Sequence, residues 1–550
     1  MRTVVILSLF FCFAVLQWQN LALFGYWNIQ NACDQSNDSI SVIQVEACFG
    51  RIRVSSTDST YLQQLLSITL PRVSREDPLF FRPELYHGGG KTHHFFEGWY
   101  HKLVHTSNCI GTEECDSESL SMAVVPGVFL DSGESAKNES HAFIFVTING
   151  EKQHYFRFDL DAELEYDTGE TTGDAGDYYV QIGNNRFSKH GLELDLKPRI
   201  YNGQPDDASV SIQGSVQYKN LSPWPIPSVY NLGAMGPVGY FLSPFLECYH
   251  DVLSFDHELE GTLVLDNDKL NHTITVLFGS SNEEETRVSS RGYVEKDRGS
   301  SFPSLWIWMQ TNSFRKQPDN EGTSLFFSVA RIPILTKQPQ SPHQQERNSV
   351  LATILEFVRN LLPHLEFPGF TAALWLDTPE HPKKLIPFAT WSGAFFEDLV
   401  VTEDAVTATI HSGGLASFST PQQQESIDSW TATLLSTTRY AKAWIGSWFL
   451  PYDSRKFWYK LELEADRRVP HVMLYAPRTT TMEPFVNEAL HATVAVRLYE
   501  YSLDESTGVA TERLLLDDVG EHAGLEVHQN VQYLVDNVCG KSGASLLACL

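Results

Sequence analysis

The chain has 550 residues, of which 42% are hydrophobic and 20% are charged, and this excludes a polytopic membrane protein, a fibrous repeat and a mainly disordered chain. Asp and Glu number 68 against 40 Lys and Arg, a formal net charge of −28, which repels phosphate backbones and argues against nucleic-acid binding. The 33 Phe, 21 Tyr and 12 Trp favour β-structure and large apolar cavities over helical bundles.

The N-terminus has the pattern of a targeting segment, because one Arg precedes an apolar run within residues 1–17. This predicts a signal peptide or signal anchor over residues 1–27, followed by a polar extension over 28–80. We therefore expect the protein to enter the secretory pathway as a secreted, lumenal or membrane-anchored protein, with a two-step route to a plastid as the alternative. Glycosylation sequons agree with this route and lie at Asn37, Asn138, Asn220 and Asn271.

From residue 81 onward the hydrophobic pattern has period two, which predicts strands separated by Gly, Asn and Asp turns. Examples are HAFIFVTI (141–148), SVSIQGSVQY (209–218), FTAALWL (370–376) and LHATVAVRLYEY (490–501). Long helices do not alternate with these strands, so the pattern favours antiparallel barrels or sandwiches over a doubly wound α/β fold.

Two polar breaks divide the predicted strands into two groups. Residues 336–349 are rich in Gln, Pro and Ser and lead into an apolar helical stripe, which predicts a linker and amphipathic helix over 336–365. We predict an N-terminal β domain over 81–335, a C-terminal β domain over 366–535 with an insertion at 421–455, and a tail over 536–550. The added helices either pack against a barrel or form a lid that touches a membrane.

The densest motif is GGGKTHHFFEGWYHKLV (88–104). In a strand, alternation places Glu97, Trp99 and His101 on one face and Tyr100 and Lys102 on the other. A carboxyl group between aromatic neighbours can have a raised pKa and act as an acid. The alternative is that Glu97 forms an ion pair with a buried cation.

A second motif is ECYHDVLSFDHELEG (247–261). Strict alternation places Tyr249, Asp251, Phe255 and His257 on an apolar face, and leaves His250 on a wetter one. A polar pair such as Asp251 and His257 in an apolar wall needs hydrogen-bond partners. It indicates a structural network, an acid–base site or, less well supported by ligand spacing, a metal site.

The third motif is RGYVEKDRGSSFPSLWIWMQTNSF (291–314). Alternation groups Tyr293 with Glu295 and Asp297, and further along the chain it groups Trp306, Trp308 and Gln310. Two indoles near carboxyl groups suit a developing carbocation through cation–π attraction, although large core residues show the same pattern. Hydrolase and dehydrogenase motifs of the GxSxG, HExxH and GxGxxG types do not occur in the sequence.

Together these stretches resemble the tocopherol cyclase family, which is related to lipocalin-like carotenoid hydratases. The resemblance is carried by FFEGWYHK (95–102), LECYHDVLSFDHELEGTL (246–263), GYVEKDRGSSFPSLWIWMQTNSF (292–314), LYAPRTTTMEPFVNEAL (474–490) and AGLEVH (523–528). A departure is Arg298, where members often carry Trp. The resemblance implies a mainly β fold made of two lipocalin-like antiparallel barrel or sandwich domains with a few added helices.

The same resemblance implies an isomerase of vitamin E biosynthesis that closes the chromanol ring of a prenylquinol without a cofactor or metal. In such a reaction an acid protonates the alkene of the prenyl chain, and the phenol oxygen attacks the resulting cation. The resemblance suggests a catalytic set of Glu97, Asp251, His257, Glu295 and Asp297. It suggests a substrate-binding set of Trp99, Tyr100, Tyr249, Phe255, Tyr293, Trp306, Trp308 and Gln310.

Two other functions fit the same motifs. One is a carrier that holds a hydrophobic isoprenoid without reaction, and the other is a cofactor-free isoprenoid hydratase. In each case the expected partner is a lipophilic small molecule, with peripheral contact to a membrane as a further expectation. The signal-like leader favours the carrier, whereas the carboxyl groups of the motifs favour an enzyme.

Overall fold

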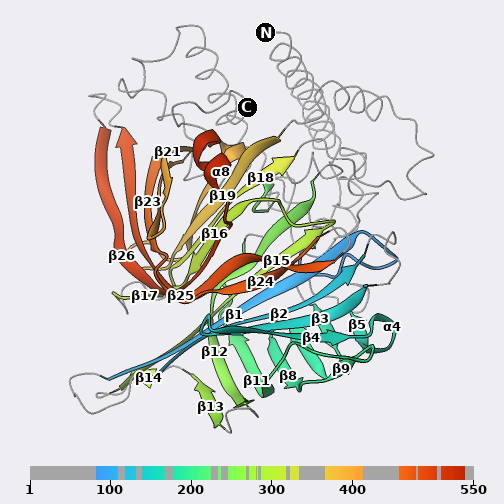
Figure 1. The fold of residues 1–550 in the computed structure, drawn as a ribbon. Helices are drawn as coiled ribbons and strands as arrows, with labels where there is room; N and C mark the ends of the chain where they lie inside the picture. Colours follow the sequence, from blue (N-terminus) through green and yellow to red (C-terminus); the bar gives the residue numbers. More distant parts are fainter. Residues whose placement is uncertain are drawn as a thin grey trace, which may run out of the picture. The chain divides into compact units, whose positions relative to one another are not determined.

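A computed structural model describes most of the chain beyond residue 81 (Figure 1). The described residues are 82–109, 118–131, 139–167, 178–224, 233–236, 246–267, 272–279, 281–282, 286–316, 322–333, 366–412, 458–478, 481–503 and 510–538. All of them belong to one compact unit, residues 81–550.

Several predicted segments lie outside the described residues. These are the signal segment (1–27), the polar extension (28–80), the linker and amphipathic helix (336–365), the insertion (421–455) and most of the tail (536–550). Of the four sequons, only Asn220 is described, and it is exposed to solvent. Within the described part of the chain, no helix has the length and apolar character needed to cross a membrane.

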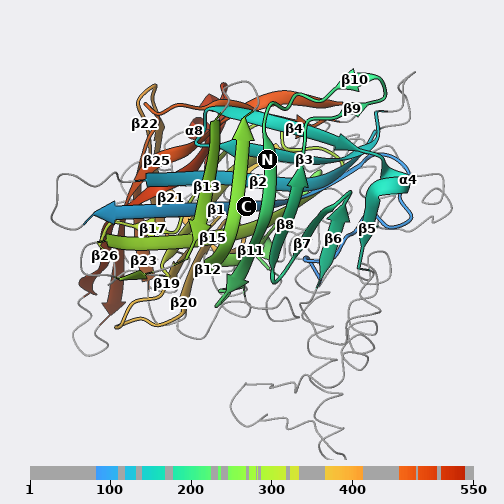
Figure 2. The ribbon, with the colours of Figure 1, turned by 90° about the horizontal axis from the view of Figure 1, so that it is seen from below.

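The first large sheet, which we call sheet 1, has 13 antiparallel strands in the order β4-β3-β2-β1-β15-β12-β11-β8-β7-β6-β5, with β13 beside β12 and β14 beside β15 (Figure 2). Its strands are β1 (Phe95–Cys109), β2 (Glu118–Leu130), β3 (His141–Ile148), β4 (Lys152–Phe158), β5 (Leu164–Tyr166), β6 (Tyr179–Ile182), β7 (Asn185–Ser188), β8 (Gly191–Leu196), β11 (Ser211–Lys219), β12 (Cys248–Asn267), β13 (His272–Phe278), β14 (Ser281–Asn282) and β15 (Thr286–Gly299). Neighbouring strands mostly follow one another in the chain. The β3–β4 hairpin turns at Asn149 and Gly150, both at positive φ, as a tight hairpin turn requires.

The second sheet, sheet 2, has 11 antiparallel strands in the order β20-β19-β18-β16-β26-β25-β23-β22-β21, with β17 beside β26 and β24 beside β25. Its strands are β16 (Trp306–Thr311), β17 (Ser313–Phe314), β18 (Ser324–Pro333), β19 (Glu366–Leu376), β20 (Lys384–Ala389), β21 (Phe395–Val401), β22 (Ala405–His411), β23 (Trp458–Asp466), β24 (Val472–Pro477), β25 (Met482–Leu503) and β26 (Ala510–Val527). The prediction of a mainly β protein built on two large antiparallel assemblies is therefore confirmed.

Short elements complete the described chain. They are the two-stranded β9 (Ile200–Tyr201) and β10 (Gln204–Pro205), the helices α4 (Leu160–Glu163) and α8 (Gln532–Asn537), and a 3₁₀ turn at Thr390–Ser392. Asp159 caps the N-terminus of helix α4, and its carboxylate accepts hydrogen bonds from the backbone N–H groups of Asp161 and Ala162. Helix α8 packs its buried Leu534 into the core of sheet 2.

The chain passes from sheet 1 to sheet 2 between Gly299 and Trp306. Strands β16 to β18 therefore belong to sheet 2, although they precede residue 335, where we predicted the domain boundary. The last strand, β26, returns to pair with β16, so residues around 307–310 lie beside residues 524–527. This pairing brings the WIWMQ and AGLEVH motifs together.

The two faces of sheet 2 pack differently. One face encloses an aliphatic core that includes Ile307, Met309, Leu461 and Val494. The opposite face, which carries Trp306 and Trp308, packs with residues of sheet 1 such as Tyr100 and Phe255 in a second, aromatic cluster. The period-two alternation of WIWM thus divides between a packed core and the contact between the sheets.

Candidate functional site

An open cavity lies between sheets 1 and 2. Its walls are largely apolar and aromatic. From sheet 1 they include Phe96, Tyr100, Val125, Phe143 and Phe145, and from sheet 2 they include Trp306, Trp308, Ile332, Phe370, Leu474 and Tyr475. Gly127 on β2 helps to shape this wall, because a Cβ there would lie 2.3 Å from the ring of Phe143. Such a space suits an elongated lipophilic molecule.

Two glutamates lie directly opposite each other beside this cavity. Glu488 on β25 pairs with Glu526 on β26 in the antiparallel register, and the two residues are 0% and 8% exposed. The indole Nε1 of Trp306 donates a 2.6 Å hydrogen bond to Glu526, and the Tyr100 hydroxyl donates a 2.8 Å hydrogen bond to Glu488. Glu526 lines the cavity.

Burial makes at least one carboxyl group of this pair neutral near pH 7. Burial raises the pKa of Glu488 to about 7. Burial, together with the charge of Glu488, raises the pKa of Glu526 well above its ordinary value. Two like charges opposite each other on neighbouring strands repel, and no Lys or Arg forms an ion pair with Glu526 among the described residues. Glu526 is therefore a neutral carboxylic acid in an aromatic cavity.

Glu295 on β15 reaches the cavity from sheet 1. Its Oε2 accepts hydrogen bonds from the Tyr293 hydroxyl at 2.6 Å and from the Trp308 indole at 3.1 Å. Burial raises the pKa of Glu295 to about 7, with the charge of Asp297 adding to the rise. The sequence grouping of Tyr293, Glu295 and Asp297 on one face of β15 agrees with these contacts.

His250 lies beside Glu295 at the same end of the cavity. Its Nδ1 is 3.1 Å from Asp297 Oδ1, its Nε2 is 3.5 Å from Glu295 Oε2, and its ring stacks on Phe326 at 4.8 Å between centroids. Burial alone would lower the pKa of His250, but the charges of Asp297 and Glu295 outweigh it and raise that pKa to about 9. The imidazole is therefore protonated at neutral pH.

The prediction that His250 occupies the wetter face of its strand was wrong. Strands β12 and β15 change register between Val252 and Ser254 and again between Ser254 and His257. These irregularities place Phe255 on the same side as His250 and Val252, although Phe255 has an odd number and the other two have even numbers. A β-bulge inserts an extra residue, so strict alternation fails across it.

His250, Glu295 and Asp297 also have donor atoms that lie within 4.8 Å of one another, which is close enough for a cation. The ion pairs among them already match one protonated imidazole with two carboxyl groups. A metal ion would bind here only after displacing the proton of the imidazole nitrogen. We therefore interpret the three residues as a hydrogen-bonded ion cluster.

Glu97 and Trp99 lie on the opposite face of β1, away from the cavity lining. Glu97 is 0% exposed and forms an ion pair with Lys296, while the backbone N–H of His87 donates a 2.8 Å hydrogen bond to it. The Lys296 ammonium lies 4.4 Å from the centre of the Trp99 ring. Burial would raise the pKa of Glu97, but Lys296 and His87 outweigh it and lower that pKa to about 2. Glu97 thus forms an ion pair with a buried cation, which was the alternative to an acid with a raised pKa.

Asp251 and Tyr249 lie on the same outer side as this ion pair. Asp251 is opposite Lys296 in the register and does not line the cavity, and the Arg298 guanidinium lies 4.6 Å from the centre of the Tyr249 ring. Burial raises the pKa of Asp251, and the nearby charges of Arg298, His250 and Lys296 counteract the rise. Arg298, which stands where the resembled family often has Trp, therefore places a cation beside Tyr249 and Asp251.

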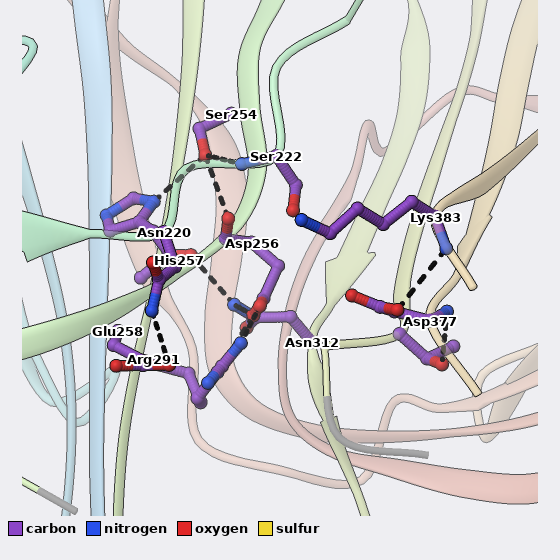
Figure 3. Close-up of polar contacts among 12 residues, drawn as sticks. Asn220, Ser222, Ser254, Asp256, His257, Glu258, Arg291, Asn312, Asp377 and Lys383 are labelled. Atoms are coloured by element: carbon purple, nitrogen blue, oxygen red, sulfur yellow. Dashed lines mark hydrogen bonds and ion pairs between the residues drawn. The ribbon is translucent and has the colours of Figure 1, made fainter. Parts of the chain in front are cut away.

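His257 and Gln310 are also remote from the cavity lining. His257 Nδ1 is 3.1 Å from the Ser254 hydroxyl, in the same region as a buried network in which Asp256 binds Arg291 and Asn312 (Figure 3). Burial lowers the pKa of His257 to about 3, so its imidazole is neutral. Gln310 Oε1 accepts a 2.8 Å hydrogen bond from the buried ammonium of Lys102.

The structure therefore brings together only part of the predicted set. The predicted residues that line the cavity are Tyr100, Glu295, Asp297, Trp306 and Trp308. Those outside the lining are Glu97, Trp99, Tyr249, Asp251, Phe255, His257, Tyr293 and Gln310. Within the second group, Tyr293 contacts the site through Glu295, and Phe255 packs in the aromatic cluster.

Three residues of the site were not predicted from the sequence, namely His250, Glu488 and Glu526. Glu488 and Glu526 lie in the motifs LYAPRTTTMEPFVNEAL and AGLEVH, which carried the resemblance but received no roles. The available signal was a glutamate next to apolar residues, Glu488 before Ala489 and Leu490 and Glu526 between Leu525 and Val527, because a buried carboxyl group is costly without a partner.

Comparisons with known proteins give no family. The chain matches no protein-family model and no curated protein sequence. Solved structures with a weak likeness include CghA with Sch210972, with a TM-score of 0.34 and 11% identity over 79% of this chain and 88% of that one. A putative AttH from Nitrosomonas europaea has a TM-score of 0.30 and 10% identity over 78% and 91% of the two chains. These scores are too low to assign a fold family or an activity.

Proposed function

We propose that the protein is a cofactor-free isomerase of the tocopherol cyclase type, which closes the chromanol ring of a prenylated benzoquinol inside the cavity between the sheets. The observation that carries the proposal is Glu526, a buried neutral carboxylic acid held by the Trp306 indole against an aromatic wall. Acid catalysis on an alkene requires such a group.

The first step uses Glu526 as the proton donor. Its carboxyl O–H bond breaks and a C–H bond forms at the less substituted carbon of the prenyl double bond, which leaves a tertiary cation and a carboxylate. The hydrogen bond from Trp306 stabilises the carboxylate that forms. The neighbouring Glu488 favours the neutral acid before the reaction, so the proton is still on Glu526 near neutral pH.

The cation then lies among electron-rich rings. Trp306 and Trp308 line the cavity, and the Tyr100 ring meets Trp308 edge to face at 5.3 Å. Ring quadrupoles attract a cation most strongly where water is absent. The apolar lining also limits capture of the cation by water, which would give an alcohol instead of a ring.

Glu295 is the proposed base for the second step. The phenol oxygen forms a C–O bond to the tertiary carbon and loses its proton to Glu295, whose pKa of about 7 suits proton transfer in either direction near neutral pH. Substrate and product have the same composition, so no electron acceptor and no water are consumed. As the acid, Glu526 takes the place of Glu97 and Asp251, which lie away from the cavity lining.

The test is turnover by the purified full chain with a prenylated methylbenzoquinol, followed by chromatography because substrate and chromanol have equal mass. Boiled protein is needed as a control, since acid alone can close the ring. Glu526→Gln should abolish product. Glu521→Gln should not, because Glu521 is a partly exposed glutamate of the same strand that pairs with Arg315. Product heavier by one water would indicate a hydratase. Bound and unchanged quinol with both proteins would indicate a carrier.

A further inference from the structure

The cavity lining has a strongly polar region formed by His250, Asp297 and Glu295. Away from Glu526 and this cluster, the lining is dominated by aromatic and aliphatic side chains, including Phe143, Phe145, Ile332 and Leu474. A ligand that fills the cavity therefore places one of its ends against three titratable groups. The chemistry of that end can be deduced from the free hydrogen-bonding positions there.

The ring of His250 is fixed in place. Asp297 binds Nδ1, Phe326 stacks at an interplanar angle of 8°, and the backbone N–H of His250 contacts Met235 Sδ at 3.2 Å. Its Nε2 is buried and has no hydrogen-bond partner in the described part of the chain. Glu295 Oε2 lies 3.5 Å from Nε2, an ion-pair distance that leaves the N–H available.

This arrangement offers one donor and one acceptor close together. A protonated His250 donates from Nε2, and the carboxyl group of Glu295 can accept. A hydroxyl group satisfies both because it accepts and donates at once. A carboxylate ligand would be repelled by Asp297 and Glu295, and an ammonium ligand has no lone pair to accept the hydrogen bond from His250 Nε2.

We propose that His250 and Glu295 together form the binding site for a hydroxyl group of a neutral lipophilic phenol, with Asp297 as the residue that positions His250. The inference rests on the proposed function, because it takes this hydroxyl as the one whose oxygen closes the ring. It adds a selectivity, since neutral phenols and alcohols enter and lipids that end in a carboxylate are excluded.

A binding cycle tests this site without any turnover. The ligands are a benzoquinol with a saturated side chain, which cannot cyclise, and its two mono-O-methyl ethers. Affinity is measured with the full chain by quenching of tryptophan fluorescence. We expect one of the two ethers to bind the wild-type protein about 10- to 100-fold more weakly, because the donor and acceptor lose their partner. If both ethers bind as well as the quinol, the proposal is wrong.

The same ligands are then measured with His250→Phe, which keeps the stacked ring but removes the nitrogen atoms. The quinol and the sensitive ether should bind this variant within about twofold of each other. Ser328→Ala, which removes a different polar group from the cavity lining, should keep the wild-type ratio. A preserved ratio in His250→Phe would contradict the proposal, and the wild-type comparison of ligands remains decisive if that variant does not fold.

Selectivity is tested with hexadecanol and hexadecanoate, two chains of equal length. We expect the alcohol to bind at least about tenfold more tightly at pH 8. Equal or tighter binding of the carboxylate would overturn the proposed selectivity. None of these results depends on turnover, so a protein that binds the quinol as described but forms no chromanol would disprove only the proposed function.

Discussion

Glu488 and Glu526 lie directly opposite each other on neighbouring antiparallel strands, both buried, and each is hydrogen-bonded to an aromatic side chain from a different part of the chain. Tyr100 comes from sheet 1 and Trp306 from sheet 2. A buried carboxyl pair of this kind is stable only when it shares at least one proton. At least one carboxyl group of the pair is therefore protonated at the wall of the cavity.

The first prediction concerns the acid itself. Glu526→Gln keeps the size and the hydrogen bond from Trp306 but cannot donate a proton to an alkene. We expect kcat for chromanol formation to fall by about 10²- to 10⁴-fold, the usual contribution of a general acid. Thermal stability should stay equal or rise slightly, because the repulsion from Glu488 is removed. Equal kcat in the variant and wild type would rule out Glu526 as the acid.

The second prediction concerns the pH profile. The charge of Glu488 raises the pKa of Glu526, so Glu488→Gln should lower that pKa. The acid then loses its proton at a lower pH, and the alkaline limb of the kcat profile should shift to lower pH. The measurement is kcat against pH for this variant, for wild type and for Glu521→Gln, which should follow wild type. A shift to higher pH would contradict the coupling.

The third prediction concerns stability. The folded-state pKa values of Glu488 and Glu295 are raised from 4.5 to about 7. Between these values the native state binds protons that the unfolded state has released, so the contribution of both groups to stability falls as the pH rises through this window. Glu488→Gln should flatten the decrease of Tm between pH 5 and 7 relative to wild type. An unchanged slope would show that the group is not neutral in the folded protein.

The fourth prediction separates Glu97 from catalysis. Glu97→Gln leaves the buried Lys296 without its carboxylate, and removing one partner of a buried ion pair costs about 3–5 kcal/mol of unfolding free energy. Denaturant unfolding should show this loss, while kcat per folded molecule should change by less than about threefold. A fall in kcat as large as that of Glu526→Gln would show that Glu97 takes part in catalysis.

A fifth prediction concerns metal removal. We interpret His250, Glu295 and Asp297 as an ion cluster, so prolonged dialysis against a chelator should leave quinol turnover and Tm unchanged. Inactivation that is reversed by added Zn²⁺ or Mg²⁺ would instead assign these residues as metal ligands.

Local alternation predicted the strands well because it depends only on neighbouring residues. It placed Trp306 and Trp308 on one face, and both line the cavity. It failed along β12, because the two irregularities in register after Val252 depend on the partner strand β15. Sequence periodicity contains no information about such a shift.

The acid pair shows a second limit. Glu488 and Glu526 are close only because β25 and β26 pair in one register, and they border a cavity only because another sheet packs against them. Glu97 illustrates the reverse case, since an aromatic motif around a carboxyl group indicated an acid, while His87 and the sequence-distant Lys296 hold it ionised. In each case, partners from distant parts of the chain determine whether the carboxyl group is protonated.

The most direct test of the central claim is cyclisation of the prenylated quinol in D₂O by wild type and Glu526→Gln. The account predicts chromanol that carries one deuterium on the carbon next to the new ether carbon, because a solvent-exchanged acid protonates the alkene there. Glu526→Gln should form no more of this product than boiled protein. Chromanol without deuterium, or equal labelled product from the variant, would contradict the claim that Glu526 starts the reaction.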